Sequence, residues 1–232
     1  SPTKKLFFSL ILILIAISLK KILKIQYLNT SFYTNTIFLE NFSTIFTIFC
    51  FIILVNSLNF YDGINGQSCL FFIIAFTFLY IISGKNEFYL FNIFFIFTIL
   101  LLNLKNKLFF GDGGIFFLST IISVSFIYEY NVEKNIKFVE EIFFLLLLPG
   151  FDLVRLTFIR VFNGKNAFIG DREHLHHLIN NKLSLTLTNL VLVFSILTPV
   201  ILFSFLDIGF YYVFLIFIFI YISLILTFKS ND

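Results

Sequence analysis

The chain ends in an uninterrupted apolar run, IGFYYVFLIFIFIYISLILTF, which extends from Ile208 to Phe228. These 21 residues contain no charged side chain, and about 20 apolar residues are enough for an α-helix to cross the hydrocarbon core of a bilayer. The run is continuously apolar, whereas the strands of a membrane barrel alternate apolar and polar residues. It therefore predicts a transmembrane helix.

Similar runs recur along the 232 residues, of which 59% are hydrophobic and 12% are charged. A soluble domain carries about 25% charged residues, so this composition excludes a soluble globular fold, and it also excludes disorder. The predicted fold class is all-α: a polytopic transmembrane helical bundle that forms one domain over 1–232. The eight predicted spans are Leu6–Leu23, Phe42–Leu58, Cys69–Ser83, Phe88–Leu104, Ile115–Tyr128, Phe138–Pro149, Leu185–Leu206 and Ile208–Phe228.

The basic residues predict the orientation of the bundle. Eight spans place both termini on one side, where ten Lys and Arg residues fall, against six on the other side. Cytoplasmic loops carry the excess of Lys and Arg, so we expect both termini in the cytoplasm. The net charge of +3 is small and dispersed, which argues against a nucleic-acid partner.

The first polar cluster lies between the second and third spans and reads Asn56-Ser-Leu-Asn59-Phe-Tyr-Asp62-Gly63-Ile-Asn65-Gly66. Asn56, Asn59 and Asp62 are three residues apart and can share one helix face. The glycines permit a tight turn and close approach of a ligand, and the following helix N-terminus attracts anions. The alternative is an ordinary Asn/Gly turn between two helices.

The second cluster, Phe109-Phe110-Gly111-Asp112-Gly113-Gly114, precedes the fifth span. A carboxylate among glycines suits a hard cation together with phosphate oxygens on backbone N–H groups. A plain glycine-rich turn is the alternative. With Asp62 on the same face, Asp112 supplies the second carboxylate of a possible Mg²⁺–diphosphate site.

The third cluster occupies the predicted loop from Asp152 to Lys182. It holds Asp152, Arg155, Arg160, Gly164, Asp171, Arg172, His174, His176 and His177. Cationic groups beside a phosphate-bearing ligand fit this composition. Three alternatives remain: a zinc site on the histidines, a solvated helix with chance histidines, and a simple Asp152–Arg155 ion pair.

The predicted topology brings the three clusters together, because the third, fifth and seventh spans begin on the same side and each follows one cluster. Two carboxylates, several cations and three helix N-termini would then face a metal-bound diphosphate. A transporter or ion-coupled carrier is the rival class. Carriers hold their sites near the bilayer midplane and often contain inverted repeats, whereas these clusters share one face and the sequence has no repeat.

The motifs resemble those of the polyprenyl-phosphate N-acetylhexosamine-1-phosphate transferases, integral membrane enzymes of bacterial envelope glycan synthesis. Asn56-x-x-Asn59-x-x-Asp62-Gly63-x-x-Gly66 is similar to the family's Asn/Asp-Gly motif, and Phe110-Gly111-Asp112-Gly113-Gly114 to its Gly-Asp-x-Gly motif. Pro149-x-x-Asp152-x-x-Arg155 and the segment from Asp171 to Leu178 are similar to its last cytoplasmic loop. The pattern His174-Leu-His176-His177 resembles the branch that uses UDP-N-acetylglucosamine or related UDP-amino sugars.

The resemblance implies transfer of a HexNAc-1-phosphate to undecaprenyl or another polyprenyl phosphate in the bacterial cytoplasmic membrane, with release of UMP and dependence on Mg²⁺ (Mn²⁺ possible). It implies that Asp112 and Asp62 hold the metal. The catalytic residues that it implies are Asp62, Asp112, His174, His176 and His177, with the histidines binding the charge of the diphosphate. The substrate-binding residues that it implies are Asn56, Asn59, Asn65, Phe110, Arg155, Asp171 and Arg172.

Two departures from the family pattern stand out. Asn65 replaces a frequent aspartate, and the family's aspartate pair would fall just before Ser1. From the second departure we expect the 232-residue chain alone to be catalytically incomplete, or to be a relative that only binds the sugar nucleotide.

Overall fold

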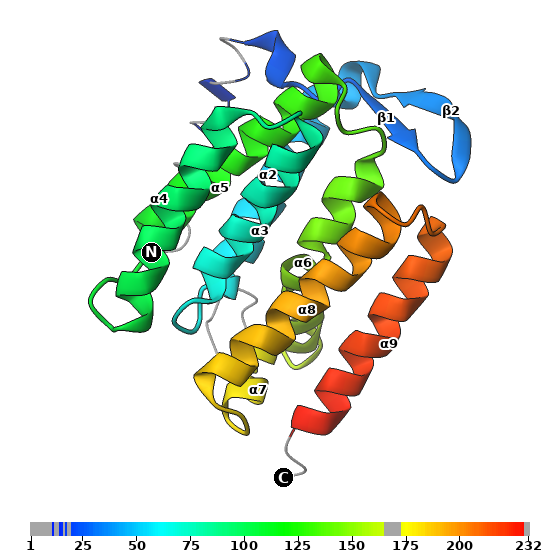
Figure 1. The fold of residues 1–232 in the computed structure, drawn as a ribbon. Coiled ribbons are helices and arrows are strands. Elements are labelled where there is room, and N and C mark those ends of the chain that lie inside the picture. The colour runs from blue at the N-terminus through cyan, green and yellow to red at the C-terminus, as the bar shows by residue number, and fades with distance from the viewer. Residues whose placement is uncertain (1–10, 12–13, 16, 18–19, 165–172, 230–232) are drawn as a thin grey trace.

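The computed structural model describes residues 20–164 and 173–229, together with Ile11, Leu14, Ile15 and Ile17. Within this part the chain forms a bundle of long helices with a small β-hairpin at one end (Figure 1). The α-helices are α2 (Ser43–Tyr61), α3 (Gln67–Ile82), α4 (Glu87–Leu104), α5 (Gly111–Tyr128), α6 (Val139–Phe162), α7 (Leu175–Asn180), α8 (Leu185–Ser204) and α9 (Phe210–Phe228). The shorter elements are η1 (Lys21–Leu23), β1 (Tyr27–Thr30), β2 (Tyr33–Phe38), η2 (Glu40–Phe42) and η3 (Glu129–Glu133).

The long helices have the length and composition of membrane spans. Six are long and apolar enough to cross a bilayer: α2 with η2, α4, α5 with η3, α6, α8 and α9. On α9, Phe219 is 76% exposed and Leu226 is 75% exposed, which fits a lipid environment and not water. The predicted multi-pass, all-α membrane fold is therefore confirmed.

Two predicted spans need separate comment. Helix α3 has 16 residues, or about 24 Å at 1.5 Å per residue, so it is shorter than the six long helices. Its side chains Phe72, Ala75 and Phe76 are 0% exposed, which makes α3 a central helix. The span predicted over Leu6–Leu23 lies largely outside the described residues.

Helix α6 continues beyond the predicted span Phe138–Pro149, and this prediction was wrong. The helix passes through Pro149 and ends at Phe162, so Asp152, Arg155 and Arg160 lie on a helix and not in a loop. Proline is tolerated within membrane helices when neighbouring groups satisfy the freed backbone. The helix continues through its charged residues, because side chains that are distant in the sequence contact the carboxylate of Asp152.

The hairpin of β1 and β2 was not anticipated. The strands are antiparallel, and Tyr27 pairs with Phe38. An isolated two-stranded hairpin is marginally stable in water, so its attachment to the bundle matters. Glu140 at the start of α6 accepts hydrogen bonds from the backbone N–H (2.6 Å) and the hydroxyl (2.9 Å) of Ser31, and the hydroxyl of Tyr130 accepts one from the N–H of Asn29 at 2.7 Å.

The two ends of the bundle differ, as Figure 1 shows. One end carries the hairpin, and we call it the hairpin end. The other end carries the α2–α3 turn (62–66), the α4–α5 turn (105–110) and α7, and we call it the motif end. The three polar clusters of the sequence lie at the motif end or lead into it, while an aromatic and aliphatic core around Phe72, Phe76 and Phe144 fills the interior between the helices.

Candidate active site

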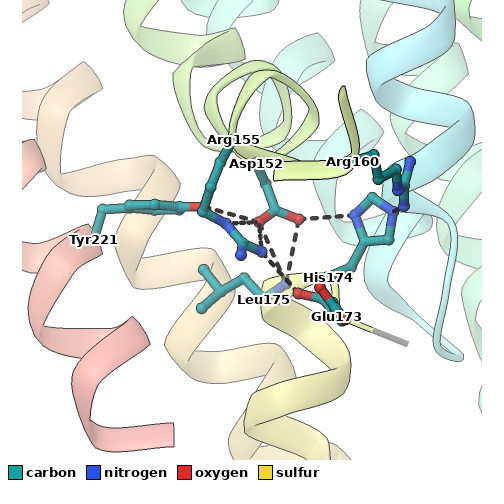
Figure 2. Close-up of polar contacts among 7 residues, drawn as sticks. All are labelled: Asp152, Arg155, Arg160, Glu173, His174, Leu175 and Tyr221. Carbon is teal, nitrogen blue, oxygen red and sulfur yellow. Dashed lines mark hydrogen bonds and ion pairs between the residues drawn. The ribbon is translucent and has the colours of Figure 1, made fainter. Parts of the chain in front are cut away.

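The carboxylate of Asp152 is the centre of a buried polar network at the motif end (Figure 2). Asp152 is 4% exposed. Its Oδ1 accepts from Nη2 of Arg155 and from the hydroxyl of Tyr221, each at 2.8 Å. Its Oδ2 lies 2.9 Å from Nδ1 of His174 and accepts from the N–H of Leu175 at 3.2 Å. The network therefore joins α6, α9 and the residue that begins α7.

The contact with Asp152 fixes the proton of His174. A carboxylate only accepts hydrogen bonds, so Nδ1 of His174 carries the proton in this contact, and Nε2 is the other ring nitrogen. Nη2 of Arg160 lies 3.5 Å from that Nε2, and the guanidinium carbon of Arg160 is 5.9 Å from the ring centre of Phe60. The predicted Asp152–Arg155 ion pair is confirmed, at 2.8 Å.

The three histidines stack against one another and against α2. The rings of His174 and His176 are 5.4 Å apart and nearly parallel, and those of His176 and His177 are 4.2 Å apart. His174 also stacks on Phe60 at 5.7 Å, and His176 meets Tyr61 edge to face at 6.3 Å. The histidine segment is thus docked onto the end of the helix that carries the first cluster.

His176 lies directly against the turn of the first cluster. A Cβ atom placed on Gly63 would overlap Nε2 of His176, so this close approach requires glycine. The Nε2 atom is buried, and no described residue gives it a hydrogen-bond partner. Burial, together with the neighbouring histidines, lowers the pKa of His176 to about 3. The ring is therefore neutral at neutral pH and offers hydrogen bonding in place of the positive charge expected from the sequence.

The residues of the first cluster follow one another along the last turns of α2. Asn56 is half-buried and donates to the carbonyl of Ile52 at 2.7 Å, Asn59 is half-buried, and Asp62 ends the helix. Burial raises the pKa of Asp62, and the hydroxyl of Ser68 partly offsets the rise. This carboxylate is partly withdrawn from water, a situation that a bound cation would relieve.

Asparagine side chains tie the first cluster to the end of α4, to the α4–α5 turn and to α8. Nδ2 of Asn65 donates to Oδ1 of Asn106 at 2.5 Å, and the N–H of Gly66 donates to Oδ1 of Asn103 at 2.5 Å. Nδ2 of Asn189 on α8 donates to the carbonyl of Asn65 at 2.9 Å. Gly66 has a φ of 86°, a left-handed conformation that favours glycine. The α2–α3 turn is therefore held by two other elements.

Asp112 lies in the first turn of α5 and is exposed. The helix begins at Gly111, so the predicted glycine loop forms the start of the helix itself. The ring of Phe110 is half-buried and packs on Phe72 at 6.1 Å, while Phe109 is 73% exposed. Phe110, which the sequence predicted as a substrate contact, therefore also packs against the core.

Arg155, predicted as a substrate contact, is engaged by protein groups: Asp152, the hydroxyl of Tyr221 at 2.7 Å and the carbonyl of Glu173 at 2.7 Å. Asp171 and Arg172 lie outside the described residues. In the described part of the chain, no group of three His, Cys, Asp or Glu side chains is arranged to hold a metal ion.

Sequence reasoning missed Asn103, Asn189 and Tyr221, and gave Asp152 no role beyond an ion pair with Arg155. The first three are polar side chains inside apolar spans, where buried polar groups need internal partners. That rule was available from the sequence, but it does not say which partner each side chain finds.

Comparison with known proteins identifies the family of the chain. The family model of glycosyl transferase family 4 matches residues 1–129, a range that contains the first two clusters and ends before the histidines. The chain has no significant match to a curated protein or to a solved structure. The match covers more than half of the 232 residues. The chain therefore belongs to glycosyl transferase family 4, the polyprenyl-phosphate sugar-1-phosphate transferases, and is a multi-pass membrane protein.

Proposed function

We propose that the chain transfers a HexNAc-1-phosphate from a UDP-amino sugar, with UDP-N-acetylglucosamine as the first candidate, to a polyprenyl phosphate. An oxygen of the lipid phosphate attacks the β-phosphorus of the UDP-sugar, and the bond from that phosphorus to the UMP oxygen breaks. The products are a polyprenyl-diphospho-sugar and UMP. The same proposal places the protein in a bacterial cytoplasmic membrane, with the motif end in the cytoplasm. It also makes the reaction the first step in the synthesis of an envelope glycan.

The observation that carries the proposal is the contact between the histidine segment and the first cluster. The neutral, buried Nε2 of His176 lies against Gly63, next to Asp62. An unpartnered buried polar atom costs free energy unless a ligand or solvent satisfies it. A diphosphate oxygen or sugar hydroxyl bound beside this contact would do so, which supports a substrate site there.

The described residues suit the reaction through positioning. A phosphate monoester has a second pKa of about 6, so the lipid phosphate is largely dianionic at pH 7 and needs little help from a base. In this proposal Asn56, Asn59 and Asn65 orient the sugar nucleotide, while His174, His176 and His177 bind the diphosphate by hydrogen bonds. Arg172 and Asp171 complete the phosphate contacts, and Phe110 borders the uracil.

The proposal assigns a Mg²⁺ ion to Asp112 and Asp62. Members of the family are generally dependent on a divalent metal, and Mg²⁺ commonly takes one or two carboxylates plus substrate phosphates and waters. These two carboxylates have that donor chemistry, and Mn²⁺ has similar preferences. Such an ion would neutralise charge that develops on the phosphoryl oxygens during transfer.

Transfer of radiolabelled UDP-N-acetylglucosamine to undecaprenyl phosphate, in membranes that carry the protein with any segment its gene encodes before Ser1, tests the proposal. We expect Asp112→Asn to lower the rate by about 100-fold or more. The matched control is Asp207→Asn, an exposed aspartate at the hairpin end whose change should leave the rate unaltered. An Asp112→Asn rate equal to wild type would exclude Asp112 as an essential group, and product formation only from other nucleotide sugars would refute the proposed substrate.

A further inference from the structure

The hairpin end carries a surface with large exposed apolar side chains. The segment from Tyr27 to Leu39, YLNTSFYTNTIFL, contains no charged residue. Five large apolar side chains here and in η2 are exposed by 43% to 71%: Phe32, Tyr33, Ile37, Phe38 and Phe42. Strands that face water usually carry charges at their edges, which prevent pairing with other chains. The two strands of this surface, which we call the hairpin face, have none, and the exposed Glu40 in η2 lies at its border.

Several contacts fix the hairpin to the bundle. Tyr27 packs its ring on Tyr130 at 5.1 Å, and its hydroxyl donates to the carbonyl of the same residue at 3.2 Å. The ammonium of Lys134 lies over the Tyr27 ring, 4.5 Å from its centre. Together with the bonds from Glu140 to Ser31, these contacts leave β2, all six of whose residues are exposed, with its outer face turned away from the bundle.

Ring contacts set the level of the hairpin relative to the membrane. Phe32, in the turn between the strands, lies 5.2 Å from Phe210 and 5.7 Å from Tyr211. Both belong to the first turn of the membrane span α9. Tyr211 and Tyr212 are 63% and 71% exposed, as expected for aromatic residues at the boundary between lipid and water. The hairpin face is therefore continuous with the lipid-facing side of α9, and Figure 1 shows the hairpin reaching sideways at that end.

We propose that the hairpin face lies in the bilayer itself, in the headgroup layer of the leaflet opposite the motif end, as an interfacial anchor made of a β-hairpin. The depth follows from the backbone. Within the described residues, the outer edge of β2 has N–H and C=O groups without a strand partner, and such groups are not tolerated in the hydrocarbon core. Headgroups and their water satisfy them, while Phe38 and Phe42 reach the upper acyl chains.

The test uses tryptophan fluorescence, since the chain has no tryptophan and one introduced residue is the sole reporter. Phe38→Trp and, separately, Phe42→Trp replace exposed aromatic rings and should not disturb folding. Each variant is reconstituted into phosphatidylcholine–phosphatidylglycerol vesicles at a low protein-to-lipid ratio. Quenching is measured with lipids that carry a nitroxide near the headgroup or deep in the acyl chain, and with iodide in water.

Two control variants frame the scale: Phe219→Trp in the middle of α9 and Glu133→Trp at an exposed polar position of the hairpin end. We expect both hairpin reporters to be quenched most by the shallow nitroxide and to be protected from iodide relative to Glu133→Trp. Iodide quenching equal to that of Glu133→Trp would overturn the proposal. Protection that disappears on dilution of the protein in the membrane would also overturn it, because a second copy would then cover the face.

Discussion

Asp152→Asn is the substitution that tests the buried network most directly. It keeps the shape of the side chain and removes the charge that Arg155, Tyr221 and His174 share. Removing one partner of a buried ion pair costs about 3–5 kcal/mol. Because the network joins α7 to α6 and α9, we expect that cost to appear as opening of α7 and not as loss of the whole bundle.

The size of the effect follows from the energy. Each 1.4 kcal/mol changes an equilibrium about tenfold, so 3–5 kcal/mol corresponds to roughly a 100- to 3,000-fold increase in opening. Tyr221→Phe removes one hydrogen bond to a charged acceptor, worth about 1.5–3 kcal/mol, and should raise opening by roughly 10- to 100-fold. The two variants should therefore form a graded series.

Hydrogen–deuterium exchange measures that opening. The amides of Leu178 and Asn181 donate to the carbonyls of His174 and His177 within the α7 segment and become exchangeable when α7 undocks. Their exchange should accelerate in the order wild type, Tyr221→Phe, Asp152→Asn, while amides in the middle of α3 stay unchanged. Asp207→Asn is the control for loss of a carboxylate. Equal α7 exchange in wild type and Asp152→Asn would refute the argument that this carboxylate holds the segment.

Three further predictions concern the turn, the histidines and the orientation. Gly63→Ala should displace His176, because the added Cβ overlaps the ring. It should lower the transfer rate by at least about 100-fold, while the thermal unfolding of the bundle changes little. A normal transfer rate would contradict the close contact. Since burial lowers the pKa of His176 from 6.5 to about 3, the free energy of unfolding should fall as pH drops from 6.5 towards 3, by up to about 1.4 kcal/mol per pH unit. His176→Gln should flatten this pH dependence in a thermal-shift series. An unchanged pH dependence would show that other groups cause it. Lys107→Cys in the exposed α4–α5 turn should react with a membrane-impermeant maleimide in inverted vesicles only, and labelling in intact cells would reverse the predicted orientation.

The membrane spans could be predicted from the sequence because hydropathy is a local property. The boundaries of the predicted runs Phe88–Leu104 and Ile208–Phe228 lie within one helical turn of the boundaries of α4 and α9. The continuation of α6 was not predictable in the same way. Asp152 contacts His174 and Tyr221, which are 22 and 69 residues away in the sequence, and local composition does not contain these contacts.

The sequence predicted which end of the bundle holds the candidate site, and it predicted few of the contacts there; the roles of the site residues stay predictions. The sequence indicated that the three clusters share one end of the bundle, and the structure brings His176 against Gly63 there. It did not indicate the asparagine contacts, because Asn103 and Asn189 find partners 37 and 124 residues away. The hairpin was missed for the same reason, since it depends on Glu140, 109 residues from Ser31.

The participation of Tyr221 has a consequence for biosynthesis. Helix α9, which is made after the histidine segment, supplies a donor to the carboxylate that holds the first histidine. Until α9 has entered the membrane, the histidine segment lacks one of its anchors, although all three histidines have already been made. The network would then close only after the insertion of α9, and a nascent chain without α9 would hold the histidine segment less firmly.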